Sequence, residues 1–148
     1  MENTNFKELN KQYQDLLLEA EKAVKTAYDP YSKLFVGAAL LTKDNKVITG
    51  SNVKGAVSGI CAERVAIFKA NSMGERHFKA IAIISSFENE RPITPCGICR
   101  QMLFEFSQVS SIDLDVIMSN INKDKIIIAK LSELLPLAFD LNIEINNF

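Results

Sequence analysis

An uninterrupted apolar run at residues 80–84, Ala-Ile-Ala-Ile-Ile, constrains the fold of this chain more than any other feature. The run is short and rich in β-branched residues, which suits a central strand buried on both faces of a sheet. A strand buried on both faces needs helices on each side of its sheet. The chain is therefore expected to have an α/β fold in which helices cover a central sheet.

The rest of the chain supplies helices and strands in alternation. An amphipathic helix is predicted before Pro30, because apolar residues recur there at three- and four-residue steps. Its apolar stripe consists of Phe6, Leu9, Tyr13, Leu16, Leu17, Ala20, Ala23, Val24 and Ala27. Strands are predicted at 35–41, 46–50, 114–118 and 125–128, helices at 61–70 and 97–106, and a helical turn at 131–135. These segments predict a sheet of about five strands.

Length and composition suit one domain that covers residues 1–148, with 47% hydrophobic and 24% charged residues. Nothing approaches the run of about 20 apolar residues that a membrane span needs, and residues 1–5 lack a signal-peptide pattern. We therefore expect a cytoplasmic protein without a membrane partner. A formal net charge of -1, with lysines and glutamates mixed along the chain, disfavours a nucleic-acid partner.

The three cysteines carry the clearest chemical signal. Cys61 opens one predicted helix, and Cys96 and Cys99 stand at the start of another. Three cysteines cannot all pair in disulfides, so metal binding or catalysis explains them better, although small buried apolar residues are the alternative. If the two helix starts converge, their dipoles should lower the pKa of each thiol. Three protein ligands and one open position are typical of a catalytic zinc site.

Glu63 stands two positions after the first of these cysteines. It would lie near the metal without binding it, and could move protons between the attacking water and the substrate. A Cys or His, one residue, a Glu, and later Pro-Cys-x-x-Cys form the general pattern of zinc deaminases. Residues 61–63 and 95–99 contain this pattern in its three-cysteine form.

Three thiolates around Zn²⁺ leave a negative site that disfavours ionisation of bound water. Arg64 and Arg100, each beside a ligand-bearing residue, could offset it by donating hydrogen bonds to sulfur. The alternative for both is an exposed helical arginine. His77, the single histidine, lies in a polar turn and is expected to be solvated rather than a ligand.

Beyond the cysteine pattern, several blocks of this chain resemble the small homotetrameric cytidine deaminases over about residues 27–139. These blocks are Tyr31-Ser32, Val36-Gly37-Ala38-Ala39-Leu40, Thr49-Gly50-x-Asn52-Val53, Cys61-Ala62-Glu63-Arg64, Pro95-Cys96-Gly97-x-Cys99-Arg100-Gln101 and Leu134-Leu135-Pro136. The resemblance implies a three-layer α/β/α fold with a mixed sheet, one zinc per subunit, and active sites completed by neighbouring subunits of a homotetramer or, as an alternative, a dimer. It also implies that Arg64 bonds to the ligand thiolates.

Departures from this family concern the substrate contacts. Asn52 matches the family residue that grips the ribose, but Lys54 stands where the family has a glutamate, and a donor replaces an acceptor. Leu34 replaces a usual phenylalanine, for which Phe35 could compensate. Phe139 looks like an aromatic that the family contributes to a neighbour's site, and a core aromatic is the alternative. Backbone groups near Ala62 and Cys96 are expected to orient the base.

The expected function is hydrolytic deamination of cytidine or 2′-deoxycytidine in pyrimidine salvage. Lys54, together with a segment between Asn52 and Cys61 similar in length to that of blasticidin-S deaminases, keeps open a modified aminopyrimidine nucleoside as substrate. A zinc-stabilised interaction module without catalysis is a further alternative, although structural zinc sites normally have four protein ligands. An editing deaminase is disfavoured by the near-neutral charge and the lack of aromatic-studded basic segments.

Overall fold

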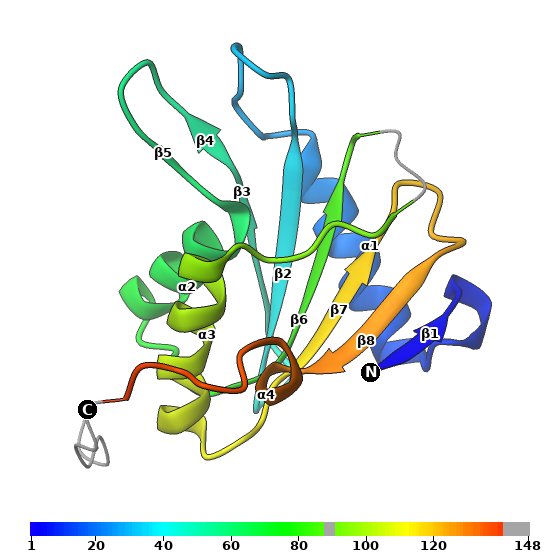
Figure 1. The fold of residues 1–148 in the computed structure, drawn as a ribbon, viewed down its shortest axis with the longest axis vertical. Coiled ribbons are helices and arrows are strands. Elements are labelled where there is room, and N and C mark those ends of the chain that lie inside the picture. Colours follow the sequence, from blue (N-terminus) through cyan, green and yellow to red (C-terminus); the bar gives the residue numbers. More distant parts are fainter. Residues whose placement is uncertain (88–90, 141–148) are drawn as a thin grey trace.

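A computed structural model describes residues 1–87 and 91–140, and within them a six-stranded mixed sheet forms the centre of the molecule (Figure 1). Its strands follow the order β1-β8-β7-β6-β2-β3. Only β6 and β7 run parallel among these neighbouring pairs; the others are antiparallel. The strands are β1 (Glu2–Thr4), β2 (Val36–Thr42), β3 (Val47–Ser51), β6 (Phe78–Ser85), β7 (Asp115–Ser119) and β8 (Ile126–Lys130).

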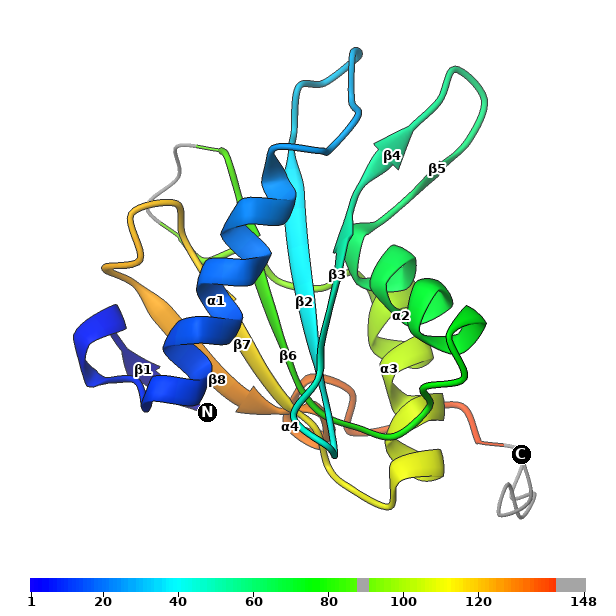
Figure 2. The ribbon, with the colours of Figure 1, turned by 180° about the vertical axis from the view of Figure 1, so that it is seen from behind.

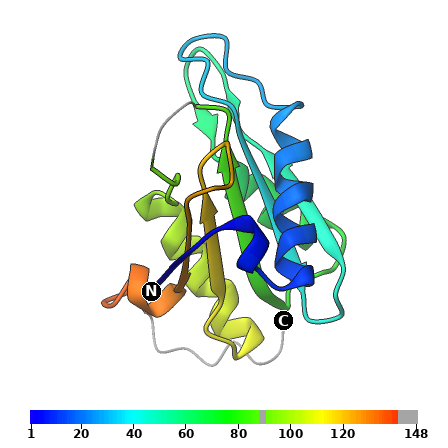
Figure 3. The same ribbon diagram turned by 90° about the vertical axis from the view of Figure 1, so that its right-hand side faces the viewer.

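Helices cover both faces of this sheet, which confirms the three-layer α/β/α architecture. Helix α1 (Lys11–Val24) lies across one face (Figure 2). Helices α2 (Ala62–Ser72) and α3 (Gly97–Ser110) cover the other face, and the short α4 (Leu131–Leu134) follows β8. The sheet is seen between α1 and α3 in the side view (Figure 3). No helix in the described ranges is both long enough and apolar enough to cross a membrane.

Strand β6 lies in the middle of the sheet, as the apolar run at 80–84 predicts. Ile81 and Ile83 belong to the core beneath α2 and α3, whereas Ala80, Ala82 and Ile84 belong to the core beneath α1. All five side chains are 0% exposed. The two-residue period of a strand thus divides one apolar run between two cores, which fixes β6 between the helical layers.

Two glycines allow the helices to approach the sheet closely. A Cβ atom on Gly37 of β2 would lie 2.0 Å from the carbonyl oxygen of Ala20 in α1. A Cβ atom on Gly50 of β3 would lie 2.4 Å from both the carbonyl oxygen of Ala62 and the backbone nitrogen of Ala66. Ala62 is the first residue of α2. Gly50 therefore sets how closely the start of this helix lies against the sheet.

The sheet has one strand more than the five that the sequence predicts. The extra strand, β1, is polar and three residues long, so it carries no apolar alternation; it pairs with β8 at the sheet edge. A second, two-stranded sheet was also not predicted, and it consists of β4 (Val53–Lys54) and β5 (Gly59–Ile60). The first helix is shorter than predicted, since residues 6–8 form a separate 3₁₀ turn, η1 (Phe6–Glu8), and α1 ends at Val24.

Candidate metal centre

The N-terminal ends of α2 and α3 bring the three cysteines together. Cys61 is the N-cap of α2, Cys96 is the N-cap of α3, and Cys99 lies in the first turn of α3. The Sγ atoms of Cys61 and Cys96 are 3.8 Å apart, and those of Cys96 and Cys99 are 3.5 Å apart. All three sulfurs lie within 4.8 Å of one another.

The chemistry of these donors suits zinc. In the described part of the chain, the group of potential ligand atoms contains the three sulfurs and neither a carboxylate nor an imidazole. His77 is exposed, in the segment just before β6. Three soft thiolates and a fourth position left to solvent or substrate match a catalytic zinc site rather than a closed structural one. The residues present therefore fit the metal that the sequence pattern predicts.

The thiols do not all have the lowered pKa that the helix dipoles predict. Burial raises the pKa of Cys61 and of Cys99, and the charge of Glu63 adds to both shifts. Burial also acts on Cys96, but hydrogen bonds from the backbone N–H of Cys99, with the Cys99 and Cys61 thiols, and from the backbone N–H of Ile98 together outweigh burial and lower the pKa of the Cys96 thiol. The half-buried thiol of Cys61 and the buried thiol of Cys99, both beside a carboxylate, thus favour the neutral form, and a divalent cation is the charge that would reverse this preference.

Arg64 lies against two of the sulfurs. Burial opposes its charge, but hydrogen bonds to the Cys61 and Cys99 sulfurs raise the pKa of the Arg64 guanidinium. Its Nε atom is buried and has no hydrogen-bond partner among the described residues. That Arg64 donates to zinc-bound thiolates stays a prediction.

Arg100 has different contacts from those expected. Its Nε donates to the carbonyl oxygen of Pro95 at 2.8 Å, and its Nη1 donates to the carbonyl oxygen of Leu134 at 3.0 Å. The guanidinium therefore ties the residue before Cys96 to the end of α4. Arg100 supports the position of Cys96 through the backbone, and its two side-chain hydrogen bonds do not go to sulfur.

Glu63 is buried beside the cluster, with 4% of its surface exposed. Burial raises the pKa of Glu63, against hydrogen bonds from its own backbone N–H and from the Cys99 thiol. A carboxyl group in this environment can exchange protons more readily near neutral pH than an exposed one. The position of Glu63 in the first turn of α2 follows from Cys61 as N-cap.

A cavity of about 550 Å³ opens beside Glu63 and the cluster. Four predicted substrate residues line it, namely Leu34, Asn52, Lys54 and Ala62. Phe35 is not part of the lining, and its carbonyl oxygen accepts a hydrogen bond from Ser86 N. Phe139 also lies outside the lining, with 69% of its surface exposed. Its backbone N–H and carbonyl oxygen both bond to the amide side chain of Gln101 in α3.

Asn52 holds the cavity wall. Its Oδ1 accepts from Val36 N at 2.7 Å, and its Nδ2 donates to the carbonyl oxygen of Leu34 at 2.8 Å. These two bonds hold the backbone at Leu34 and at the start of β2 beside the cavity. One Nδ2 hydrogen and further Oδ1 lone-pair capacity remain for a ligand.

Among the lining residues that sequence reasoning did not assign to the site are Asp29 and Ser32. Asp29 accepts hydrogen bonds from the backbone nitrogens of Tyr31, Ser32 and Leu34 and from the Ser32 hydroxyl. An Asp directly before Pro30 is a turn signal, since its side chain can bond to backbone groups two or three residues ahead. That signal could have indicated an ordered loop at 29–34.

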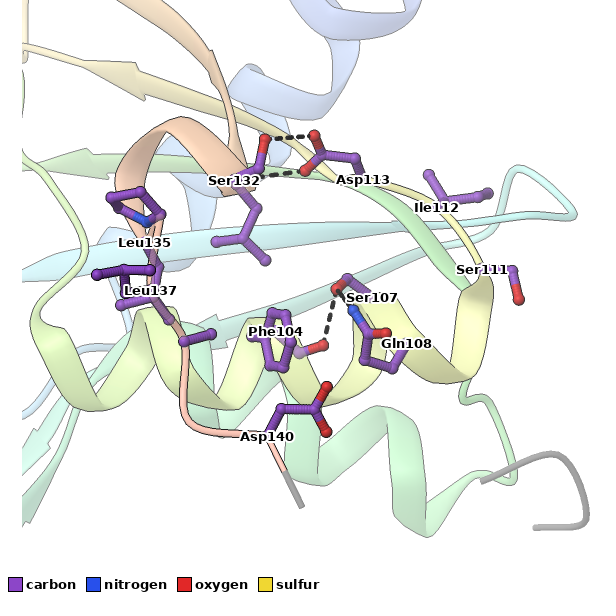
Figure 4. Close-up of a pocket in the computed structure, with 13 residues that line it drawn as sticks. Phe104, Ser107, Gln108, Ser111, Ile112, Asp113, Ser132, Leu135, Leu137 and Asp140 are labelled. Atoms are coloured by element: carbon purple, nitrogen blue, oxygen red, sulfur yellow. Dashed lines mark hydrogen bonds between the residues drawn. The ribbon is translucent and has the colours of Figure 1, made fainter. Parts of the chain in front are cut away.

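A second hollow of about 530 Å³ lies between α3 and the segment after α4, and it shares no lining residue with the first cavity (Figure 4). Asp113 accepts hydrogen bonds there from the backbone nitrogen and hydroxyl of Ser132. Ser107 Oγ donates to the Phe104 carbonyl oxygen. The lining of this hollow contains neither Glu63 nor any of the three cysteines, so the cavity beside Glu63 is the better candidate for substrate.

Comparison of this chain with protein families, known sequences and solved structures gives related matches. The family described as the cytidine and deoxycytidylate deaminase zinc-binding region matches residues 10–112, a range that includes all three cysteines and Glu63. A cytidine deaminase of Halalkalibacterium halodurans is 46% identical over 128 residues, covering 85% of this chain and 92% of that protein. A crystal structure of cytidine deaminase from Burkholderia pseudomallei matches with a TM-score of 0.78 and 40% identity, covering 86% of this chain and 98% of that one. A blasticidin-S deaminase of Bacillus cereus is 28% identical over 146 residues, covering 93% of this chain and all of that protein.

Proposed function

This chain belongs to the family of the cytidine and deoxycytidylate deaminase zinc-binding region, and on that premise we propose that it hydrolyses cytidine or 2′-deoxycytidine to the corresponding uridine nucleoside and ammonia. One observation carries the proposal: Glu63 lines a cavity large enough for a nucleoside, together with Cys61 and Cys96. An acid–base group, a metal-binding cluster and a substrate cavity therefore share one place.

Cys61, Cys96 and Cys99 would hold one zinc ion per subunit. Zinc in such a site acts as a Lewis acid that makes water a nucleophile near neutral pH. Arg64 would balance the thiolate charge through its hydrogen bonds to Cys61 and Cys99.

Glu63 would move the protons of the reaction. Its carboxylate accepts one proton from the attacking water and delivers it to N3 of the pyrimidine ring. It then transfers the second water proton to the departing amino nitrogen. A C4–O bond forms and the C4–N bond breaks, so the products are a uridine ring and ammonia. Backbone groups near Ala62 and Cys96 would orient the base, and Asn52 would contact the sugar.

A second candidate substrate is a modified aminopyrimidine nucleoside of the blasticidin-S type. The observation that favours it is the ammonium group of Lys54 on the cavity wall. A cation there can meet an anionic group on a substrate, such as the carboxylate that blasticidin S carries on its sugar. The similarity to a blasticidin-S deaminase of Bacillus cereus supports the same candidate.

The proposal also covers the metabolic role, the location and the oligomeric state of the protein. We place the protein in pyrimidine salvage, in the cytoplasm, as a homotetramer with no nucleic-acid or membrane partner. The exposed apolar side chains of Leu137 and Phe139, next to α3, support an assembly in which Phe139 reaches a neighbour's cavity.

A substrate panel tests the function. Purified zinc-loaded protein is given cytidine, 2′-deoxycytidine, free cytosine, blasticidin S and adenosine, and ammonia release is measured for each. We expect release from the cytidine nucleosides and far slower release from cytosine and adenosine. Preference for blasticidin S would favour the second candidate. Absence of release from every compound would contradict catalysis and favour a zinc-stabilised interaction module.

A further inference from the structure

The three cysteines of the metal centre are not held equally by packing. Cys99 is 0% exposed, and Ala62, which follows Cys61 in α2, is also 0% exposed. Residues 96–98, in contrast, are all exposed. A Cβ atom on Gly97 would meet nothing within 4 Å among the described residues. Packing therefore holds Cys99 and the start of α2, whereas Cys96 depends on its backbone contacts.

One residue binds the backbone on both sides of Cys96. The backbone nitrogen of Arg100 donates to the Cys96 carbonyl at 2.9 Å, and the side-chain Nε of Arg100 donates to the Pro95 carbonyl at 2.8 Å. These carbonyls belong to the two peptide planes that flank the Cα atom of Cys96. The orientation of these planes defines the φ and ψ of Cys96, which are -68° and 167°. Arg100 therefore fixes the direction in which the Cys96 side chain leaves the backbone.

Pro95 makes the side-chain bond from Arg100 costly to lose. Pro95 is buried, and a buried carbonyl oxygen needs a hydrogen-bond donor. Proline has no N–H of its own with which to anchor this part of the chain. The donor in Arg100 is charged, and a charge-assisted hydrogen bond is stronger than a neutral one.

The guanidinium of Arg100 is anchored at its other end. Its Nη1 donates at 3.0 Å to the carbonyl of Leu134, the last residue of α4. Helix α4 is itself fixed, because Leu131 is 1% exposed and its N–H donates to the Leu114 carbonyl at 2.9 Å. The N–H groups of a guanidinium have fixed directions in one plane, so the contact with Leu134 aims the contact with Pro95.

We propose that Arg100 is a positioning residue of the metal centre, which holds Cys96, but not Cys61 or Cys99, in the direction needed to bind zinc. The proposal rests on the zinc site proposed above. Arg100 acts through the backbone at Pro95, since its two side-chain hydrogen bonds go to carbonyl oxygens. Residues that orient metal ligands contribute about 10- to 100-fold to metal affinity.

Gln101 offers a matched control. It follows Arg100 in α3 and also binds the segment after α4, through two hydrogen bonds of 2.8 and 3.0 Å with the backbone of Phe139. Neither bond involves Pro95. Gln101→Ala therefore loosens the same segment without releasing Pro95, and it separates positioning of Cys96 from general support by that segment.

Zinc affinity gives the first test. Chelator competition measures the zinc dissociation constants of wild type, Arg100→Met, Arg100→Lys, Gln101→Ala and Arg76→Met. Arg76 controls for the loss of one guanidinium, because it binds Asn71 in the last turn of α2, away from the cysteines. We expect Arg100→Met to bind zinc about 10- to 100-fold more weakly and both controls to bind it like wild type. Arg100→Lys should be intermediate, since an ammonium keeps the charge but lacks the planar fork.

Alkylation of the zinc-loaded proteins identifies the ligand that is released. Iodoacetamide reacts with free thiolates faster than with zinc-bound ones, and fragmentation of the peptides by mass spectrometry locates the label. We expect Arg100→Met and Arg100→Lys to raise the initial rate at Cys96 and to leave the rates at Cys61 and Cys99 unchanged. General destabilisation would raise all three rates.

Three results overturn the proposal: wild-type zinc affinity in Arg100→Met, an equal loss of affinity in Gln101→Ala, or an equal rise in alkylation at all three cysteines. Circular dichroism checks the fold, and if Arg100→Met does not fold, the same criteria apply to Arg100→Lys. Each of these results leaves the deaminase function in place, provided that zinc-loaded wild type releases ammonia from cytidine. Wild type that binds no zinc would overturn the zinc site and this inference together.

Discussion

The sulfur atoms of Cys61 and Cys96 lie 3.8 Å apart although 35 positions separate the two residues in the sequence. Each is the N-cap of a helix, and neither side chain caps its own helix by a hydrogen bond. Strand β6 runs between the two helices in sequence and lies in the middle of the sheet that both cover. The sheet therefore brings the two helix starts together and leaves both sulfurs for a shared ligand.

Loss of one thiol should release the metal. We expect about one zinc per chain in the purified protein, and Cys96→Ala should lose it, because two thiolates do not make a three-ligand site. Ile98→Ala is the matched control, since Ile98 lies between the two cysteines in the same turn and is 62% exposed. Metal analysis by mass spectrometry measures both variants. Stoichiometric zinc in Cys96→Ala would remove Cys96 from the ligand set.

Gly50→Ala should destabilise the protein, because the added Cβ would lie 2.4 Å from backbone atoms of α2. Overpacking of this kind costs about 1–3 kcal/mol of the free energy of unfolding. Gly97→Ala is the control, as a Cβ there meets nothing within 4 Å. Denaturant unfolding compares the two variants with wild type. Equal stability of the two variants would mean that α2 does not depend on Gly50 for its position.

The stability of the protein should depend on pH through the protonation of the Asp29 carboxylate. The Ser32 hydroxyl and the backbone N–H groups of the loop lower the pKa of Asp29 from 3.8 to about 2. A lowered pKa means that the stabilising contribution is complete above the unfolded value of 3.8 and is lost as the pH falls through about 2. We expect Asp29→Asn to be less stable than wild type at neutral pH, and this difference to shrink between these two values.

Urea unfolding of both proteins across this pH range measures that difference. A difference that stays constant down to pH 2, or equal stability at neutral pH, would show that the Asp29 carboxylate does not stabilise the loop.

Periodicity predicted the parts of this fold that bury apolar surface. The run at 80–84 became the central strand, and the polar turn at 43–45 connects β2 and β3. Strand β1 escaped prediction because its three polar residues are held by backbone hydrogen bonds to β8, which leave no apolar pattern in the sequence. The end of α1 was also predicted wrongly. The apolar residues continue to Ala27, whereas the helix ends at Val24.

The candidate site, like the fold, could be predicted from the sequence only in part. The cysteines and Glu63 were predicted because their chemistry requires fixed residue types at fixed spacing. The contacts of Arg100 could not be read from its neighbours in sequence, because the Leu134 carbonyl that it reaches lies 34 positions away. The raised pKa of the Cys99 thiol depends on burial and on the charge of Glu63, which only the packed helices determine. The hydrogen bonds from Lys54 to Ser32 and from Ser32 to Asp29 likewise depend on two distant segments meeting.

The central claim is that Glu63 moves the protons while the cysteines hold the metal, and Glu63→Gln tests it most directly. The amide keeps the size of the side chain but cannot exchange protons. Zinc content, circular dichroism and kcat/KM for cytidine are measured together, with Glu105→Gln, an exposed carboxylate on α3, as control. We predict that Glu63→Gln keeps the zinc and the fold and loses about 100- to 10,000-fold in kcat/KM, while Glu105→Gln stays active. Turnover within a few-fold of wild type in zinc-loaded Glu63→Gln would contradict the account.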